Sequence, residues 1–230
     1  MDFRMTGHIC RWAAILSLAS LVDCTRQPSP QQGGAVRAGW NRLHYFPVLP
    51  GATWDFTGPF GRVVVGNWTN PPAGESTSTF RLDFVDSSSV PRLQETFTVV
   101  GDQVFWRDYR LPNFPQIVFD PPLPVLPHSA NPGDSLVVDS IERWEDSVRI
   151  SFEVKAVQVV LGVEDIDVPA GTFENCIHVR QAILYRDRSL PHLFSWIELW
   201  YAKGVGWVRY DSQAGSGELV TARVGEKHFP

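Results

Sequence analysis

The chain has 230 residues, a formal net charge of −5, 43% hydrophobic residues and 20% charged residues. This length and apolar fraction are enough for a packed core, so they exclude a largely disordered chain, a collagen and a polytopic membrane protein. The 20 Lys and Arg residues are outnumbered by 25 Asp and Glu residues, which leaves no general attraction to the phosphate backbone of a nucleic acid. We therefore expect a globular protein with no nucleic-acid partner.

The N-terminal segment has the pattern of a signal peptide. Arg4, His8 and Arg11 precede an uncharged stretch over residues 12–22. A stretch of this length is typical of a signal-peptide core, whereas a membrane-spanning helix needs roughly 20 apolar residues. The sequence therefore predicts a signal peptide over residues 1–23 and an exported mature protein.

Cys24 comes directly after this segment. Leu21-Val22-Asp23-Cys24 resembles the lipobox of bacterial lipoproteins. The resemblance implies that the Cys24 thiol receives a diacylglycerol and that the protein is anchored to a membrane of the bacterial cell envelope. Asp23 departs from this pattern, in which a small residue precedes the cysteine, so ordinary cleavage and an uncleaved anchor remain alternatives.

The other two cysteines suggest no redox or zinc site. Cys10 lies in the predicted signal peptide, which leaves Cys176 either as a buried, inert thiol or in a disulfide with Cys24. The chain has no Cys-x-x-Cys pattern, so neither a zinc knuckle nor a thioredoxin-type site is predicted.

Residues 24–39 are predicted to form a flexible tether. Within them, residues 25–38 are polar, rich in Pro and Gly and without an apolar period, a composition typical of linkers. A lipid-anchored domain would use such a segment to stand away from the membrane surface. The folded domain is expected over residues 40–230.

Strand patterns dominate the sequence after the tether. Residues 148–156 alternate apolar and polar side chains with a period of two, which predicts an antiparallel strand with one buried and one solvated face. A similar alternation runs over residues 176–186. Weaker strand candidates lie near residues 52–57, 61–68, 78–86, 94–100, 103–109, 135–144, 194–202, 205–211 and 217–224.

Helical patterns are nearly absent, and the 18 prolines would interrupt most candidate helices. The Pro-rich stretch over residues 111–133 is expected to be an extended loop or an edge covering, because proline cannot donate to the hydrogen-bond ladder of a central strand. About eleven strands point to a single all-β antiparallel domain, as a strongly curved sheet, a closed or nearly closed barrel, or a sandwich. A division into two domains near the Pro-rich stretch is the alternative.

The motif Val168-Pro-Ala-Gly-Thr-Phe173 is predicted to form a sharp turn between two strands. Pro169 has a fixed φ and no amide proton, and Gly171 permits a positive φ. The chain can therefore reverse and return Phe173 to the core. We expect a structural role for these residues.

A second glycine motif lies in residues 202–210. Gly204 and Gly206 flank a valine, which suits a turn or bulge that re-aims the next residue, Trp207. The motif is no nucleotide-binding fingerprint, because the third glycine and the following helix are missing. Its predicted role is also structural.

Three motifs together resemble those of a family of uncharacterised bacterial exported proteins and lipoproteins. They are Tyr45-Phe-Pro-Val-Leu-Pro-Gly-Ala-Thr-Trp54, the motif over 168–173 and Trp200-Tyr-Ala-Lys-Gly-Val-Gly-Trp207. In that family a YFPL…GxxW opening, a VPAGTF turn and a W[YF]AxGVG strand occur in the same order. The resemblance implies an exported all-β domain with no established activity, and Ala52 and Asp55 depart from its pattern.

Known catalytic motifs are missing from the sequence, which has no Gly-x-Ser-x-Gly elbow, His-Glu-x-x-His, phosphate-binding loop or Ser-x-x-Lys. We therefore predict no catalytic residue, no cofactor and no metal. A metal site at His178 and His192 with Glu164, Asp165 or Asp167 is permitted by spacing, but a solvated strand face explains the same residues. A carboxylate pair for glycoside hydrolysis remains an alternative. Its candidates are Asp83, Asp86, Glu142, Glu145 and Glu198.

Aromatic residues are numerous, with 9 Trp, 14 Phe and 5 Tyr. In a curved or closed sheet these rings either fill the interior or line a cavity for a ligand. Trp196, Glu198 and Trp200 share one face of a predicted strand and form a candidate ligand surface. If this face points inward, Glu198 needs a partner such as Arg180 or Arg186, or a ligand.

Together these patterns predict an exported, lipid-anchored envelope protein that binds an apolar or amphipathic ligand, or a protein partner, and is not an enzyme. The alternatives are a periplasmic hydrolase with a carboxylate pair and a structural component of envelope assembly. A ring-lined cavity favours binding, facing carboxylates favour hydrolysis, and a filled interior with an exposed apolar patch favours assembly. The sequence makes no prediction of the oligomeric state.

Overall fold

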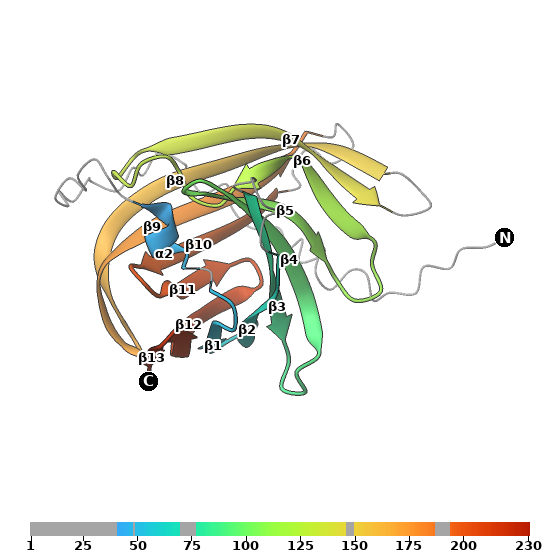
Figure 1. The fold of residues 1–230 in the computed structure, drawn as a ribbon. Coiled ribbons are helices and arrows are strands. Elements are labelled where there is room, and N and C mark those ends of the chain that lie inside the picture. Colours follow the sequence, from blue (N-terminus) through green and yellow to red (C-terminus); the bar gives the residue numbers. More distant parts are fainter. Residues whose placement is uncertain (1–40, 48, 70–76, 146–149, 187–193) are drawn as a thin grey trace. The chain divides into compact units, whose positions relative to one another are not determined.

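The described part of the chain folds almost entirely into antiparallel strands (Figure 1). The computed structural model describes residues 41–47, 49–69, 77–145, 150–186 and 194–230. The predicted signal peptide, Cys24 and the tether lie outside these residues. The strands are β1 (Thr53–Phe56), β2 (Arg62–Thr69), β3 (Thr77–Val85), β4 (Pro91–Val100), β5 (Gln103–Arg110), β6 (Gln116–Pro124), β7 (Ser135–Glu145), β8 (Ile150–Val168), β9 (Gly171–Tyr185), β10 (Phe194–Ala202), β11 (Gly206–Ser212), β12 (Gly215–Val224) and β13 (Lys227–Phe229).

The sheet closes on itself. Each strand pairs with the next one in the sequence, and β1 also pairs with β12. In this closing pair Thr53 lies opposite Arg223 and Phe56 lies opposite Leu219. Within the described residues, twelve strands therefore form a closed antiparallel barrel, and β13 extends the sheet beside the end of β12. The prediction of an all-β antiparallel fold with very little helix is confirmed, in its closed-barrel form.

Alternating side chains define the inner face of the barrel. Phe80, Leu82 and Phe84 of β3 are buried, and so are Leu199 and Tyr201 of β10. Because successive side chains of a strand point to opposite faces, these residues mark the side that faces inward. Each such large apolar side chain contributes roughly 1.5–3 kcal/mol by leaving water, so a one-residue shift in register would lose the whole set.

The Pro-rich stretch is the main difference from the prediction. Gln116–Pro124 forms β6, which lies in the sheet between β5 and β7. The expectation of a loop or edge covering over 111–133 is therefore wrong for this segment. The ladder between β6 and β7 ends at Asp120, and the pairing with β5 shifts register in the same region. Pro121 and Pro122 lie in this irregular part, where the sheet requires no donor from them.

A short helix covers one end of the barrel. This helix, α2 (Arg42–Tyr45), contacts β5 and β11. Arg42 is buried, and its guanidinium forms an ion pair with Asp102 in the β4–β5 turn at 2.7 Å. Phe46 follows the helix and packs edge-on against Trp207, with ring centroids 5.4 Å apart. These contacts insert apolar and charged side chains from outside the sheet into this end of the barrel.

The barrel interior contains two hydrophobic clusters. The larger cluster extends over β1–β5 and β8–β12, together with Phe46 and with Val125, Leu126 and Ala130 after β6. The smaller cluster consists of Phe119, Leu123, Val154 and Ala156 on β6 and β8. All described residues belong to one compact unit of the chain. No helix among them has the length and apolarity needed to cross a membrane.

Candidate functional site

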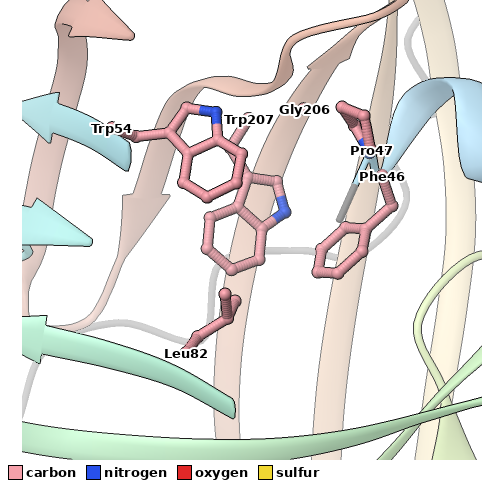
Figure 2. A pocket seen from close by; sticks show the side chains of 6 residues that line it. All are labelled: Phe46, Pro47, Trp54, Leu82, Gly206 and Trp207. Carbon is pink, nitrogen blue, oxygen red and sulfur yellow. The ribbon is translucent and has the colours of Figure 1, made fainter. Parts of the chain in front are cut away.

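A small apolar pocket lies within the larger cluster. It is lined by Phe46, Pro47, Trp54, Leu82, Gly206 and Trp207. Figure 2 shows the indole rings of Trp54 and Trp207 next to each other, with Leu82 beside them. The volume of the pocket is about 10 Å³, close to what a single water molecule needs. Side chains therefore fill this part of the interior and leave no room for a larger ligand.

The interior around the smaller cluster is less completely buried than the interior around the larger cluster. Its inward-facing side chains pack against the smaller cluster but are only partly buried, in contrast to Phe80 and Leu82 of the larger cluster. We call them the open half of the interior, and the larger cluster the sealed half. The open half consists of Trp106, Tyr109, Val138, Phe152, Ile183 and Tyr185, together with Trp144, whose ring lies 6.3 Å from that of Phe152.

Glu142 of β7 is the least exposed carboxylate among the described residues, at 2%. Its oxygens accept hydrogen bonds from Trp144 Nε1 at 2.9 Å and from Tyr185 Oη at 2.6 Å. No described Lys, Arg or His forms an ion pair with it. Buried carboxylates are ordinarily paired with a cation or a metal, and a cationic group of a ligand would supply such a partner to Glu142.

Glu95 of β4 brings a second carboxyl group to the interior. It lies opposite Leu82 of β3 and Tyr109 of β5, and it shares its strand face with the buried Phe97. Burial raises the pKa of Glu95 to about 8, because the charged form loses its hydration inside the barrel. At pH 7 Glu95 is therefore mainly protonated and can donate a hydrogen bond.

Three phenols accompany the two carboxyl groups. Burial raises the pKa of Tyr109, Tyr185 and Tyr201. The charge of Glu142 raises the pKa of Tyr109 and Tyr185 further, and the charge of Glu95 does so at Tyr109 and Tyr201. Tyr109 is thus the group that lies near both carboxyl groups, and it links Glu142 and Tyr185 to Glu95 and Tyr201 along the interior. We call these five groups together the polar lumen.

Polar atoms next to this region lack partners. Gln158 is 6% exposed, and its amide nitrogen donates to the carbonyl of Pro124, but its Oε1 has no partner among the described residues. Trp106 Nε1 and Tyr201 Oη likewise make no hydrogen bond of normal geometry within the described chain. An unpaired buried polar group costs about 1–3 kcal/mol, so a polar group that reached these atoms would be bound favourably.

The predicted ligand surface of Trp196, Glu198 and Trp200 lies on the outer face of the barrel. Leu199 and Tyr201 of the same strand face inward, so the alternating residues point outward. Trp196 is half-buried there, whereas Trp200 is buried by neighbours on the outer face. The structure therefore separates this row from the ring-rich interior.

Trp200 is held by side chains from three neighbouring strands. Its ring stacks on His178 with centroids 3.9 Å apart, and its Nε1 donates to Glu164 at 2.7 Å. The guanidinium of Arg209 lies over the same ring, 4.9 Å from the centroid. These contacts give Trp200 a packing role on the outer face.

Glu198 has the partners that a half-buried charge requires. Arg180 Nε and His178 Nε2 each lie 2.8 Å from its carboxylate, whereas Arg186, the other predicted partner, pairs with Asp139. Burial raises the pKa of Glu198, but hydrogen bonds and charges from Arg180 and His178 outweigh it and leave the pKa lowered. The protein's own groups satisfy this network.

The possible metal site at His178 brings together only part of the predicted set. His178 Nδ1 lies 3.2 Å from Glu164, and His192 lies outside the described residues. In the described part of the chain, no three His, Cys, Asp or Glu side chains are grouped so as to hold a metal ion.

The first turn motif connects β8 and β9. Pro169 and Ala170 form the turn, Gly171 has a φ of 119°, and the amide of Ala170 bonds back to β12. Phe173 is half-buried beside the larger cluster, with its ring 6.0 Å from that of Phe229. The motif thus joins two long strands without a loop.

The second motif connects β10 and β11. Gly204 and Gly206 have φ values of 80° and 98°, in the left-handed region that favours glycine. Between them, the Val205 carbonyl accepts a hydrogen bond from Trp54 Nε1 at 2.6 Å. Trp207 then packs in the larger cluster. This turn therefore holds both indoles that line the small pocket.

Most carboxylates considered for hydrolysis lie away from the interior. Asp83 pairs with Arg81 at 2.7 Å, Asp86 accepts backbone hydrogen bonds in the β3–β4 turn, and Glu145 is exposed. Of the five candidates, all within the described residues, Glu142 alone belongs to the polar lumen.

The sequence analysis missed Glu95, the other inward carboxyl group. Its signal was present, because Glu95 interrupts the apolar row formed by Leu93, Phe97 and Val99 on one strand face. The tyrosines of the polar lumen carry no such signal, because a tyrosine is common on either face of a strand.

Cys176 is fully buried and free within the described chain. Burial raises the pKa of its thiol to about 12, and the charges of Asp165 and Glu164 add to this effect. The thiolate is therefore strongly disfavoured and the group is unreactive. The alternative disulfide involves Cys24, which lies outside the described residues.

Comparison with models of protein families and with curated protein sequences gives no match. The resemblance to exported lipoproteins based on the three motifs thus stays a prediction. Among solved structures, a protein from Parabacteroides distasonis described as a candidate lipoprotein is similar to this chain, with a TM-score of 0.47 and 16% identity. The similarity covers 78% of this chain and 98% of the other.

Proposed function

We propose that this protein is an envelope binding protein that takes up an amphipathic ligand in the open half of its barrel. The observation that carries the proposal is the incomplete burial of inward-facing rings around the smaller cluster, such as Tyr109, Phe152 and Tyr185, whereas rings of the larger cluster such as Phe80 and Phe97 are almost fully buried. An apolar tail would cover the remaining ring surface, and a polar head would meet the polar lumen. Small-molecule sites are typically lined mostly by apolar side chains with a few convergent polar groups.

The test uses the neutral fluorescent probe Nile red and the folded chain. We expect Nile red to bind and its emission to increase. Ile183→Trp would fill the open half, and its expected effect is at least a tenfold loss of affinity. Ala182→Trp adds the same ring one residue away, on the outward side of β9, and serves as the matched control. No binding to the wild type, or an equal loss in both variants, would contradict the proposal.

The envelope location is part of the proposal and rests on the sequence. Residues 1–23 have the signal-peptide pattern, and Cys24 stands where a lipobox has its cysteine. Mass spectrometry of the protein purified from bacterial membranes is expected to show a mature chain that begins at diacylglycerol-modified Cys24. Cys24→Ser should release the protein from the membrane fraction. An unmodified Cys24 in membrane-bound protein would count against the anchor.

The two inward carboxyl groups favour hydrolysis as a second candidate. Glu95 is mainly protonated at pH 7, as a general acid must be, and Glu142 belongs to the same lumen. Hydrolysis predicts turnover of nitrophenyl glycosides that Glu95→Gln and Glu142→Gln both abolish, whereas a binding role predicts none. The assembly role stays a prediction, for which exposed apolar residues on β7 and β9, such as Val137 and Leu184, are the relevant surface.

A further inference from the structure

The polar lumen presents negative charge with no cation at an inward position of the described parts of β4 to β9, and the buried Arg42 at the end of the barrel is paired with Asp102. Among the described residues of β4 to β9, the Arg, Lys and His side chains lie at outward positions of the strand alternation or at exposed positions. Glu95 and Glu142 occupy inward positions on the same strands. A cationic group that entered the lumen would therefore meet carboxyl groups and no competing positive charge.

Aromatic rings surround these carboxyl groups. The ring of Trp106 lies 4.8 Å from that of Phe119 and 5.5 Å from that of Tyr109. Phe152 and Tyr185 are edge to face, with centroids 6.0 Å apart. Ring faces attract organic cations through their quadrupole, most strongly where water is excluded. Rings and a carboxylate together are the combination that recognises ammonium groups.

An independent observation indicates that the lumen accommodates a polar group. Gln158 is more than nine-tenths buried and its Oε1, an acceptor, has no partner among the described residues. Trp106 Nε1, a donor on one of the rings of the open half, likewise has no partner among the described residues. Buried polar groups are normally satisfied, so these atoms indicate a polar occupant.

We propose that the polar lumen binds the ammonium head group of a cationic amphipathic ligand. This inference rests on the proposed binding function and names its ligand class. The carboxylate of Glu142 supplies the opposite charge, the rings supply cation–π contacts, and the open half covers the apolar tail. An anionic head group would meet Glu142 with no compensating cation.

The experiment compares two probes with the same tail, decyltrimethylammonium and decyl sulfate, as competitors of Nile red below their micelle concentrations. We expect the cation to displace Nile red at a concentration at least tenfold lower than the anion. Glu142→Gln should weaken the cation at least tenfold and the anion much less. Glu145→Gln removes a charge from the exposed end of the same strand and should change neither.

A pH profile tests the contribution of Glu95. Tyr109 faces it from β5 and Leu82 faces it from β3, and Tyr201 is the other titratable group on which its charge acts. Burial raises the pKa of both phenols, so Glu95 is the group that ionises as the pH rises through about 8. Cation affinity should therefore increase several-fold between pH 6.5 and pH 9 in the wild type and stay constant in Glu95→Gln.

The outcomes separate the two proposals. If Nile red binds but both charged probes displace it equally, the ammonium assignment is wrong and the binding function stands. If no probe binds, both proposals are overturned. If Glu142→Gln does not fold, the pH profile of Glu95→Gln decides, and an unchanged pH dependence in that variant overturns the assignment.

Discussion

The sealed and open halves of the interior are packed differently within one closed barrel. In the sealed half, Phe80 stacks on Phe97 with centroids 5.1 Å apart, and it is 1% exposed. In the open half, Phe152 meets Tyr185 edge to face and stays half-buried. A barrel of this strand number encloses more space than its own side chains must fill, so dense packing in one half is compatible with access in the other.

Side chains from outside the sheet account for part of the difference. Phe46, after α2, and Phe60, in the β1–β2 connection, both pack into the sealed half. Phe60 stacks on Tyr210 with centroids 3.7 Å apart. The described residues provide no comparable ring for the smaller cluster, whose neighbours all come from strands. The comparison shows that segments outside the strands decide how completely each half is filled.

The largest expected effect comes from removing the same ring from each half. Phe80→Ala should lower the free energy of unfolding by about 3–5 kcal/mol, because it leaves a cavity in a closely packed region. Phe152→Ala should cost less than half as much, since the ring is already partly hydrated. Urea unfolding of both variants measures the difference. Equal losses would show that the open half is as well packed as the sealed half.

The next effect concerns the protonation of Glu95 in the polar lumen. Its pKa rises from 4.5 to about 8 on folding, so between these pH values the folded state binds more protons than the unfolded state. The free energy of unfolding should therefore fall as the pH rises from about 4.5 to about 8, and Glu95→Gln should remove that fall. Urea midpoints at pH 5 and pH 8.5 test this. The same pH dependence in both proteins would place Glu95 in a hydrated environment.

The smallest effect is expected on the outer face, which serves as the reference for both halves. Arg180→Ala should lower the free energy of unfolding by less than about 1 kcal/mol, because its guanidinium is exposed and screened. The pKa of Glu198 is lowered on folding, so its contribution is present at neutral pH and is lost as the pH falls through the folded value. In urea titrations, Arg180→Ala should therefore reduce the decrease in the free energy of unfolding at acid pH. A decrease of more than 2 kcal/mol in the free energy of unfolding would show that the outer network stabilises the fold as much as interior side chains do.

Local patterns predicted the strands better than they predicted the site. The two-residue alternation on β8 was clear in the sequence, because one face of each strand is buried and the other is wet. Glu95 could have been found by the same rule, because it interrupts an apolar row formed by Leu93, Phe97 and Val99. The direction of Trp196, Glu198 and Trp200 could not, because an aromatic row on a strand looks the same whether it lies inside or outside the barrel.

Sequence alone determined that the chain is all-β and antiparallel, since alternation with a period of two is a property of each strand by itself. Only the tertiary structure decided that the sheet closes, because the β1–β12 pairing joins residues about 160 positions apart and leaves no local signal. It also decided that β6 tolerates its prolines and that Glu95 and Glu142 share one lumen. These features depend on which strands become neighbours, and that is settled only when the whole barrel forms.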